Sequence, residues 1–155
     1  MTQTLLSTDA HLLRASEKTN LAVSFSVPAH TKRLDIRFSY APKTLDGEAA
    51  RPLIEACLQR DAGEFAAQYP DWTHFLPLKN LVTVSLDDPN GFRGCAHRQD
   101  DVQAHFLTED AASPGFLPGK LPAGVWRVML NIHALVTQSC DCTLKVDAEV
   151  DEHGR

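Results

Sequence analysis

The sequence predicts an all-β fold, an antiparallel β-sandwich of jelly-roll type, formed as a single domain over residues 1–155 with one small α-helical insertion. Apolar and polar residues alternate along six or more segments, which is the period of a strand with one buried face. Corners rich in glycine and proline separate those segments. A helical period occurs in one stretch, at about residues 48–68, without the strand–helix–strand rhythm that a parallel sheet requires.

Two early segments, residues 21–27 and 34–40, predict strands that each bury one face. Their alternating apolar positions are Leu21, Val23, Phe25 and Val27 in the first segment and Leu34, Ile36, Phe38 and Tyr40 in the second. Pro28 ends the first strand because proline has no N–H to donate to a neighbouring strand. Since only a short loop separates the two strands, we expect them to pair as a hairpin.

Residues 44–76 predict a helical insertion between strands, with the helix itself at about residues 48–68. Apolar residues recur there at spacings of three, four and seven: Leu53, Ile54, Cys57, Leu58 and Phe65. Pro52 fits the first helical turn, Gly63 is a point where the helix can divide, and Pro70 ends it. We expect one or two short helices that cover a sheet edge or one end of the sandwich.

The remaining strands are predicted at residues 81–86, 102–107, 126–132 and 140–150, before a polar tail at 151–155. The inward positions of the last two are Trp126, Val128, Leu130 and Ile132, then Cys140, Cys142, Leu144, Val146, Ala148 and Val150. We place His105 on the outward face of its strand. Residues 113–124 hold three prolines and three glycines, which predicts a loop.

Composition excludes several classes of partner. The chain has 15 Lys and Arg against 20 Asp and Glu, a net charge of −5, whereas nucleic acids and anionic membranes recruit basic surfaces. No window has the 18 or more apolar residues of a membrane span, and the first residues lack the basic and apolar regions of a signal peptide. Four cysteines without an export signal predict free thiols. We therefore expect a cytoplasmic protein.

Two segments carry a family resemblance: Leu-Asp-Asp-Pro-Asn-Gly-Phe-Arg-Gly at 86–94 and Ser-Pro-Gly-Phe-Leu-Pro-Gly-Lys-Leu-Pro-Ala-Gly-Val-Trp-Arg-Val at 113–128. Their order resembles the N-terminal β-sandwich domain of bacterial metal-dependent hydrolases of the polymerase and histidinol phosphatase (PHP) superfamily. More distantly, it is similar to pre-peptidase C-terminal domains and jelly-roll carbohydrate-binding modules. The resemblance implies an accessory domain. It does not imply hydrolase activity, because the early His-Xaa-His signature of those enzymes has no counterpart in this sequence.

The candidate ligand-binding residues are polar or aromatic side chains near the predicted corners: Arg93, His97, His105, Trp72 and Tyr69. Arg93 can fork a carboxylate or a hydroxyl-rich ligand or, in the alternative, fix its own corner by bonding carbonyl groups or Asp87. Trp72 and Tyr69 can stack on a ligand or pack under the inserted helix. Cys140 and Cys142 can hold a soft metal, but their spacing equally continues the inward set of the last strand.

Cys95, His97 and His105 form a second cluster that suggests a metal. A thiolate and two imidazoles suit zinc, and an open fourth position would hold a catalytic water. This arrangement needs the strands that carry the three residues to pair. It defines the alternative function, a small zinc-dependent hydrolase.

The leading prediction is a non-catalytic binding or protein-interaction module that needs no cofactor. One form of this prediction is an accessory of a metallohydrolase. We expect recognition by loops gathered at one end of the sandwich, formed by residues 87–97, 108–120 and 69–77. The expected partner is a protein or a small polar or carbohydrate ligand. Pairing of an exposed sheet edge with a second copy would make a homodimer.

Overall fold

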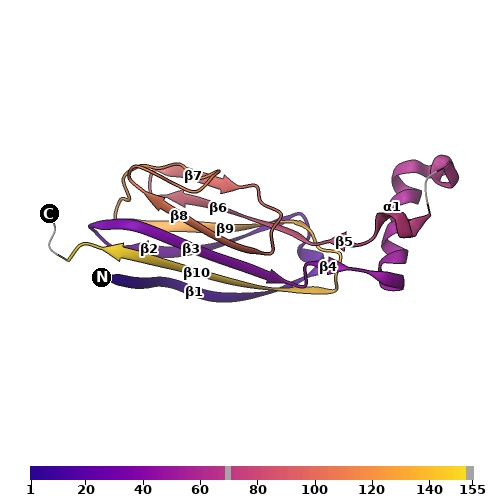
Figure 1. Ribbon diagram of the computed structural model, residues 1–155, viewed down its shortest axis with the longest axis horizontal. Helices are drawn as coiled ribbons and strands as arrows, with labels where there is room; N and C mark the ends of the chain where they lie inside the picture. The colour runs from indigo at the N-terminus through magenta and orange to yellow at the C-terminus, as the bar shows by residue number, and fades with distance from the viewer. Residues whose placement is uncertain (69–70, 153–155) are drawn as a thin grey trace.

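Two four-stranded antiparallel sheets pack face to face as a sandwich (Figure 1), which confirms the predicted fold class. The computed structural model describes residues 1–68 and 71–152. The first sheet has the order β1 (Thr2–Leu13), β10 (Ser139–Val150), β3 (Thr31–Ala41) and β8 (Val102–Thr108). The second sheet has the order β2 (Thr19–Val27), β9 (Gly124–Ala134), β6 (Leu81–Asp88) and β7 (Gly91–Ala96).

The core lies between the sheets and is built from the alternating positions of both. Trp126 is fully buried, and Phe25 and Cys142 are buried with it. Cys140 and Cys142 face this interior, so the prediction that they belong to the core is confirmed. The inward set of the last strand extends to Ala148, whereas Val150 is half-buried beyond a register shift against β3.

The expected hairpin of residues 21–27 and 34–40 is wrong. β2 pairs with β9 in the second sheet, whereas β3 lies between β10 and β8 in the first. The chain crosses between the sheets at residues 28–30, where the Thr31 hydroxyl donates to the Pro28 carbonyl at 2.8 Å and His30 has a φ of 63°. Alternation shows that a strand has one buried face, but it does not show which strand lies beside it.

The predicted orientation of β8 is also wrong. Val102 is 73% exposed, whereas His105 is 3% exposed and faces the core with Gln103 and Leu107. The reason is the register with β3, which places these three residues opposite Phe38, Ile36 and Leu34. Because residues directly opposite each other in a sheet share a face, the apolar side of β3 determines which side of β8 is buried.

The insertion follows β3 and is connected by a two-residue ribbon, β4 (Thr44–Leu45) with β5 (Leu78–Lys79). Between them lie the 3₁₀ segments η2 (Gly47–Ala50), η3 (Gly63–Gln68) and η4 (Trp72–Phe75) and the helix α1 (Arg51–Ala62). Pro52 lies in the first turn of α1, and Gly63 ends the helix at a φ of 54°. The expected helix end at Pro70 lies outside the described residues.

The position of the insertion differs from the expectation that it covers a sheet edge or an end of the sandwich. It projects beyond one end of the sandwich, opposite the end where both chain termini lie (Figure 1). Its packing is largely internal, since α1 contacts η2, η3 and η4. No helix in residues 1–68 or 71–152 is long and apolar enough to cross a membrane.

The two flanks of the sandwich are finished differently. Residues 111–119 bond to both β7 and β8: the Cys95 N–H donates to the Gly115 carbonyl at 3.0 Å, and the Ser113 N–H to the Phe106 carbonyl at 2.9 Å. Gly94 makes this approach possible, because a Cβ there would lie 2.4 Å from the Gly115 carbonyl oxygen. On the other flank, β1 pairs only with β10 and β2 only with β9, which leaves two free edges among the strands that the structure describes.

Candidate functional site

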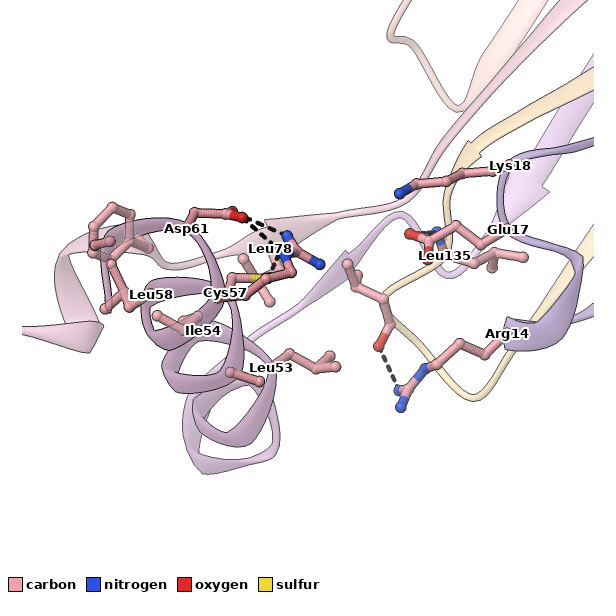
Figure 2. A pocket seen from close by; sticks show the side chains of 15 residues that line it. Arg14, Glu17, Lys18, Leu53, Ile54, Cys57, Leu58, Asp61, Leu78 and Leu135 are labelled. Atoms are coloured by element: carbon pink, nitrogen blue, oxygen red, sulfur yellow. Dashed lines mark hydrogen bonds and ion pairs between the residues drawn. The ribbon is translucent and has the colours of Figure 1, made fainter. Parts of the chain in front are cut away.

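A cleft of about 690 Å³ lies between α1 and the neighbouring end of the sandwich (Figure 2). We call it the α1 cleft. Its lining comes from three separate parts of the chain: residues 53–62 of the helix with residues 75 and 78, the turn at residues 14–18, and the loop at residues 135–136. The volume lies within the ~300–1,000 Å³ that is typical of small-molecule sites.

The helical wall of the α1 cleft is apolar. Leu53 and Ile54 occupy successive positions of the helical stripe, with Leu58 one turn further along, and Phe75 and Leu78 come from the return segment. Ile54 is buried inside the insertion, whereas Leu53 is half-buried and extends from α1 toward the sandwich (Figure 2). Because the helix projects beyond the sandwich, part of its apolar stripe faces the cleft and not a sheet.

The floor of the cleft on the sandwich side is held by one buried amide. Asn80 accepts hydrogen bonds at Oδ1 from the Val136 N–H at 2.7 Å and the Thr137 N–H at 3.4 Å. Its Nδ2 donates to the Pro42 carbonyl at 2.9 Å and to the Thr137 hydroxyl at 2.8 Å. The amide therefore ties the base of the insertion to the loop that carries Val136 and Thr137, and both of its N–H donors are used.

The rim of the cleft is charged on both walls. On α1, Arg60 and Asp61 form an ion pair at 2.8 Å, and this hydrogen bond lowers the pKa of Asp61. On the sandwich side, the Glu17 carboxylate accepts from the Leu135 N–H at 3.2 Å, and Arg14 (in η1, Arg14–Ser16) donates to the Val136 carbonyl at 2.7 Å. Lys18 extends across the opening toward α1 (Figure 2) and also lowers the pKa of Asp61.

Arg93 lies at the other end of the sandwich and is fully engaged in structure. Its five N–H groups make five hydrogen bonds, two to the Leu117 carbonyl and one each to Asp88 and to the carbonyls of Gly119 and Lys120. The guanidinium also lies 5.2 Å from the centre of the Trp126 ring. Of the two roles that the sequence leaves open, the structure shows that Arg93 fixes its corner.

The structure does not bring Cys95, His97 and His105 together. Cys95 is opposite Ser85 on the outer face of the second sheet, where Thr83 bonds its thiol and burial raises its pKa. His97 is exposed after the end of β7, and His105 faces the core from the first sheet. No group of three or more His, Cys, Asp or Glu side chains in the described part of the chain could hold a metal ion.

His105 has an unusual environment for a polar residue. Its Nε2 lies 2.9 Å from Gln103 Oε1, which can only accept, because the Gln103 amide nitrogen donates to the Asp100 carbonyl. The ring Nδ1 is buried and has no hydrogen-bond partner among the described residues. Burial lowers the pKa of His105, and the charge of Arg98 lowers it further.

The remaining candidates lie in or near the insertion. Trp72 is half-buried, with the Arg51 guanidinium 5.4 Å from its ring centre, so it packs against the inserted helix. Tyr69 lies outside the described residues.

The three loops expected at one end lie at two. Residues 71–77 belong to the insertion. Most of the expected loop at 87–97 is the strand β7, and only its turn at residues 88–91 lies, with the loop at 109–123, at the end with the termini. The loops were expected at one end because the sequence pattern does not give strand directions, and these directions decide at which end of the sandwich the insertion lies. No local pattern points to Arg14, Lys18 or Val136, because three distant segments contribute to the cleft and none carries a motif.

Comparison with protein-family models gives no match for this chain, and comparison with curated proteins gives none either. The family resemblance therefore stays a prediction from the two segments at residues 86–94 and 113–128.

Proposed function

We propose that the protein is a non-catalytic binding module that holds a small molecule with an apolar body in the α1 cleft. The observation that carries this proposal is the cleft itself, about 690 Å³ with the partly exposed side chains of Leu53, Leu78 and Val136 in its walls. An apolar lining with a few polar groups at the rim is typical of small-molecule sites. The lining favours an apolar ligand over the polar or carbohydrate ligand expected from the sequence.

The positions of the candidate residues predicted from the sequence favour a binding role over catalysis. All N–H groups of Arg93 are bonded within the protein, so none is left for a ligand. Cys95 lies on the outer face of the second sheet, whereas His105 faces the core from the first sheet. A zinc-dependent hydrolase would need Cys95, His97 and His105 to meet around one metal ion. The geometry gives that alternative no support.

Cys57 provides a test, because this exposed thiol lines the α1 cleft. The probe is 1-decanol, an apolar chain without charge, and the reagent is N-ethylmaleimide, with modification followed by mass spectrometry. We expect the rate at Cys57 to fall as decanol is titrated and to level off at saturation. The rate at Cys95, which lies on the outer face of the second sheet, should stay constant.

Leu53→Asp should abolish protection of Cys57, since a carboxylate in the apolar wall is costly to bury against a hydrocarbon chain. The matched control is Leu117→Asp, because Leu117 is 49% exposed and its N–H donates to the carbonyl of Arg93, at the other end of the sandwich. Protection that persists in Leu53→Asp, or a Cys57 rate indifferent to decanol, would contradict the proposal.

A second candidate function, an accessory of a metallohydrolase, is favoured by the contacts between the two segments that carry the resemblance. Arg93 of the first bonds Leu117, Gly119 and Lys120 of the second. The strand order, with β1 beside β10 and β2 beside β9, supports the jelly-roll assignment of such domains. Phe92 is 61% exposed and precedes Arg93, whose carbonyl accepts from the Leu117 N–H, and it would contact the enzyme.

Sedimentation with a purified PHP-superfamily hydrolase domain tests this role. A complex that Phe92→Asp abolishes and Leu53→Asp retains would support it. Separate sedimentation of the two proteins at micromolar concentration would contradict it.

A further inference from the structure

The charged side chains around the α1 cleft differ in how far their bonding capacity is used. Arg60 and Asp61 bond to each other, and Glu17 accepts from the Leu135 N–H. Arg14 has one hydrogen bond, from Nη2 to the Val136 carbonyl, which leaves most of its five N–H groups open. The Lys18 ammonium has no hydrogen bond and no ion pair within 4.0 Å among residues 1–68 and 71–152.

The turn that carries both cations is firmly held. The Arg14 N–H donates to the Gln138 carbonyl at 3.2 Å, the Glu17 N–H to the Arg14 carbonyl at 3.0 Å, and the Lys18 N–H to the Ile132 carbonyl at 2.7 Å. Lys18 has a φ of 62°, a left-handed conformation that few residues other than glycine adopt. The surrounding bonds impose this conformation, and it directs the side chain across the cleft toward α1 (Figure 2).

The charge at this wall is opposite to that of the whole chain. The sandwich side of the rim holds two cations and one anion, whereas the chain has a net charge of −5. The one anion, Glu17, is already oriented by a backbone N–H. Two cations with open donors beside an apolar wall match a ligand with a hydrocarbon body and an anionic head.

We propose that the ligand of the α1 cleft is an amphipathic carboxylate, such as a medium-chain fatty acid. The carboxylate lies between Arg14 and Lys18, and the chain lies against Leu53 and Val136. Arg14 offers the fork of donors that matches two carboxylate oxygens, and Lys18 adds a point charge. This inference rests on the proposed function, because it specifies the head group of a molecule that the cleft is proposed to bind.

Calorimetric titration separates the two proposals with three probes that share a ten-carbon chain and differ in the head group: decanoate, 1-decanol and decyltrimethylammonium. We expect decanoate to bind at least about tenfold more tightly than decanol, because hydrogen bonds to charged groups contribute more than 1.4 kcal/mol. The preference should decrease as salt is raised, since the rim is exposed to solvent. Decyltrimethylammonium should bind more weakly than decanol.

The variant Arg14→Gln with Lys18→Gln should lose the preference for decanoate and retain its affinity for decanol. Lys32→Gln is the matched control, because Lys32 is an exposed lysine in the first residues of β3, at the other end of the sandwich. Its preference should equal that of the unmodified protein.

The outcomes are distinguishable. Equal affinity for decanoate and decanol, or a preference for the cation, overturns the carboxylate assignment and leaves the proposed function standing. A decanoate preference that survives in the double variant also overturns it, since the anion would then bind elsewhere. Failure of all three probes to bind overturns the proposed function itself.

Discussion

The two ends of the sandwich differ in how far an arginine side chain is buried and hydrogen-bonded. At the end with the termini, Arg93 is 7% exposed and all of its N–H groups are bonded within the protein. At the insertion end, Arg14 is exposed and makes one side-chain hydrogen bond, whereas the neighbouring Lys18 side chain makes none to the part of the chain that the structure describes. The first end is a closed corner, and the second is an open cleft between parts that do not pack tightly together.

This difference separates stability from recognition. A buried charge must be fully bonded, because desolvation costs several kcal/mol that only good partners offset. An exposed cation without a partner costs little folding stability, so its donors can remain available for a ligand. The arginine that the sequence motif brings to attention is therefore structural, and the cations proposed to bind a ligand carry no motif.

The largest expected effect comes from opening the closed corner. Arg93→Ala leaves the Asp88 carboxylate, which is 7% exposed at its side chain, without its ion-pair partner. We expect the free energy of unfolding to fall by about 3–5 kcal/mol, measured by urea denaturation. The control is Arg127→Ala, whose exposed pair with Asp87 should contribute at most about 1 kcal/mol. Equal losses in the two variants would show that the corner is not closed.

The next effect tests whether the insertion is an independent unit. Ile54 is 4% exposed inside the insertion, and truncating a buried aliphatic side chain to alanine costs about 2–5 kcal/mol where the site cannot collapse. In Ile54→Ala, hydrogen exchange should accelerate at the amides of α1 and stay unchanged in β9. Faster exchange in both would mean that the sandwich depends on the insertion.

The smallest effect concerns acid sensitivity of the sandwich. The folded protein holds the pKa of His105 below its ordinary value of about 6.5, so below that pH the unfolded chain binds more protons than the folded one. Stability should therefore fall as the pH decreases from 6.5, by at most about 1.4 kcal/mol per pH unit. His105→Gln should flatten this dependence, and His30→Gln, at an exposed turn, should not. Identical pH profiles of all three proteins would exclude His105 as the cause.

The sequence by itself determined the fold class, the inward face of most strands and the position of the helix. Trp126, Cys142 and Phe25 are buried as predicted because each is in phase with the other apolar residues of its strand, and residues two apart lie on the same face. α1 begins beside Pro52 and ends at Gly63, since local backbone preference fixes both points.

Only the tertiary structure decided strand partners, the buried face of β8 and the place of the cleft. β8 presents polar and apolar residues on both sides, so its orientation followed from the apolar face of β3 and not from its own pattern. The α1 cleft joins residues 14–18, 53–62 and 135–136, which no local signal connects. Periodicity describes how one segment meets water, whereas a site made of distant segments depends on which strands become neighbours.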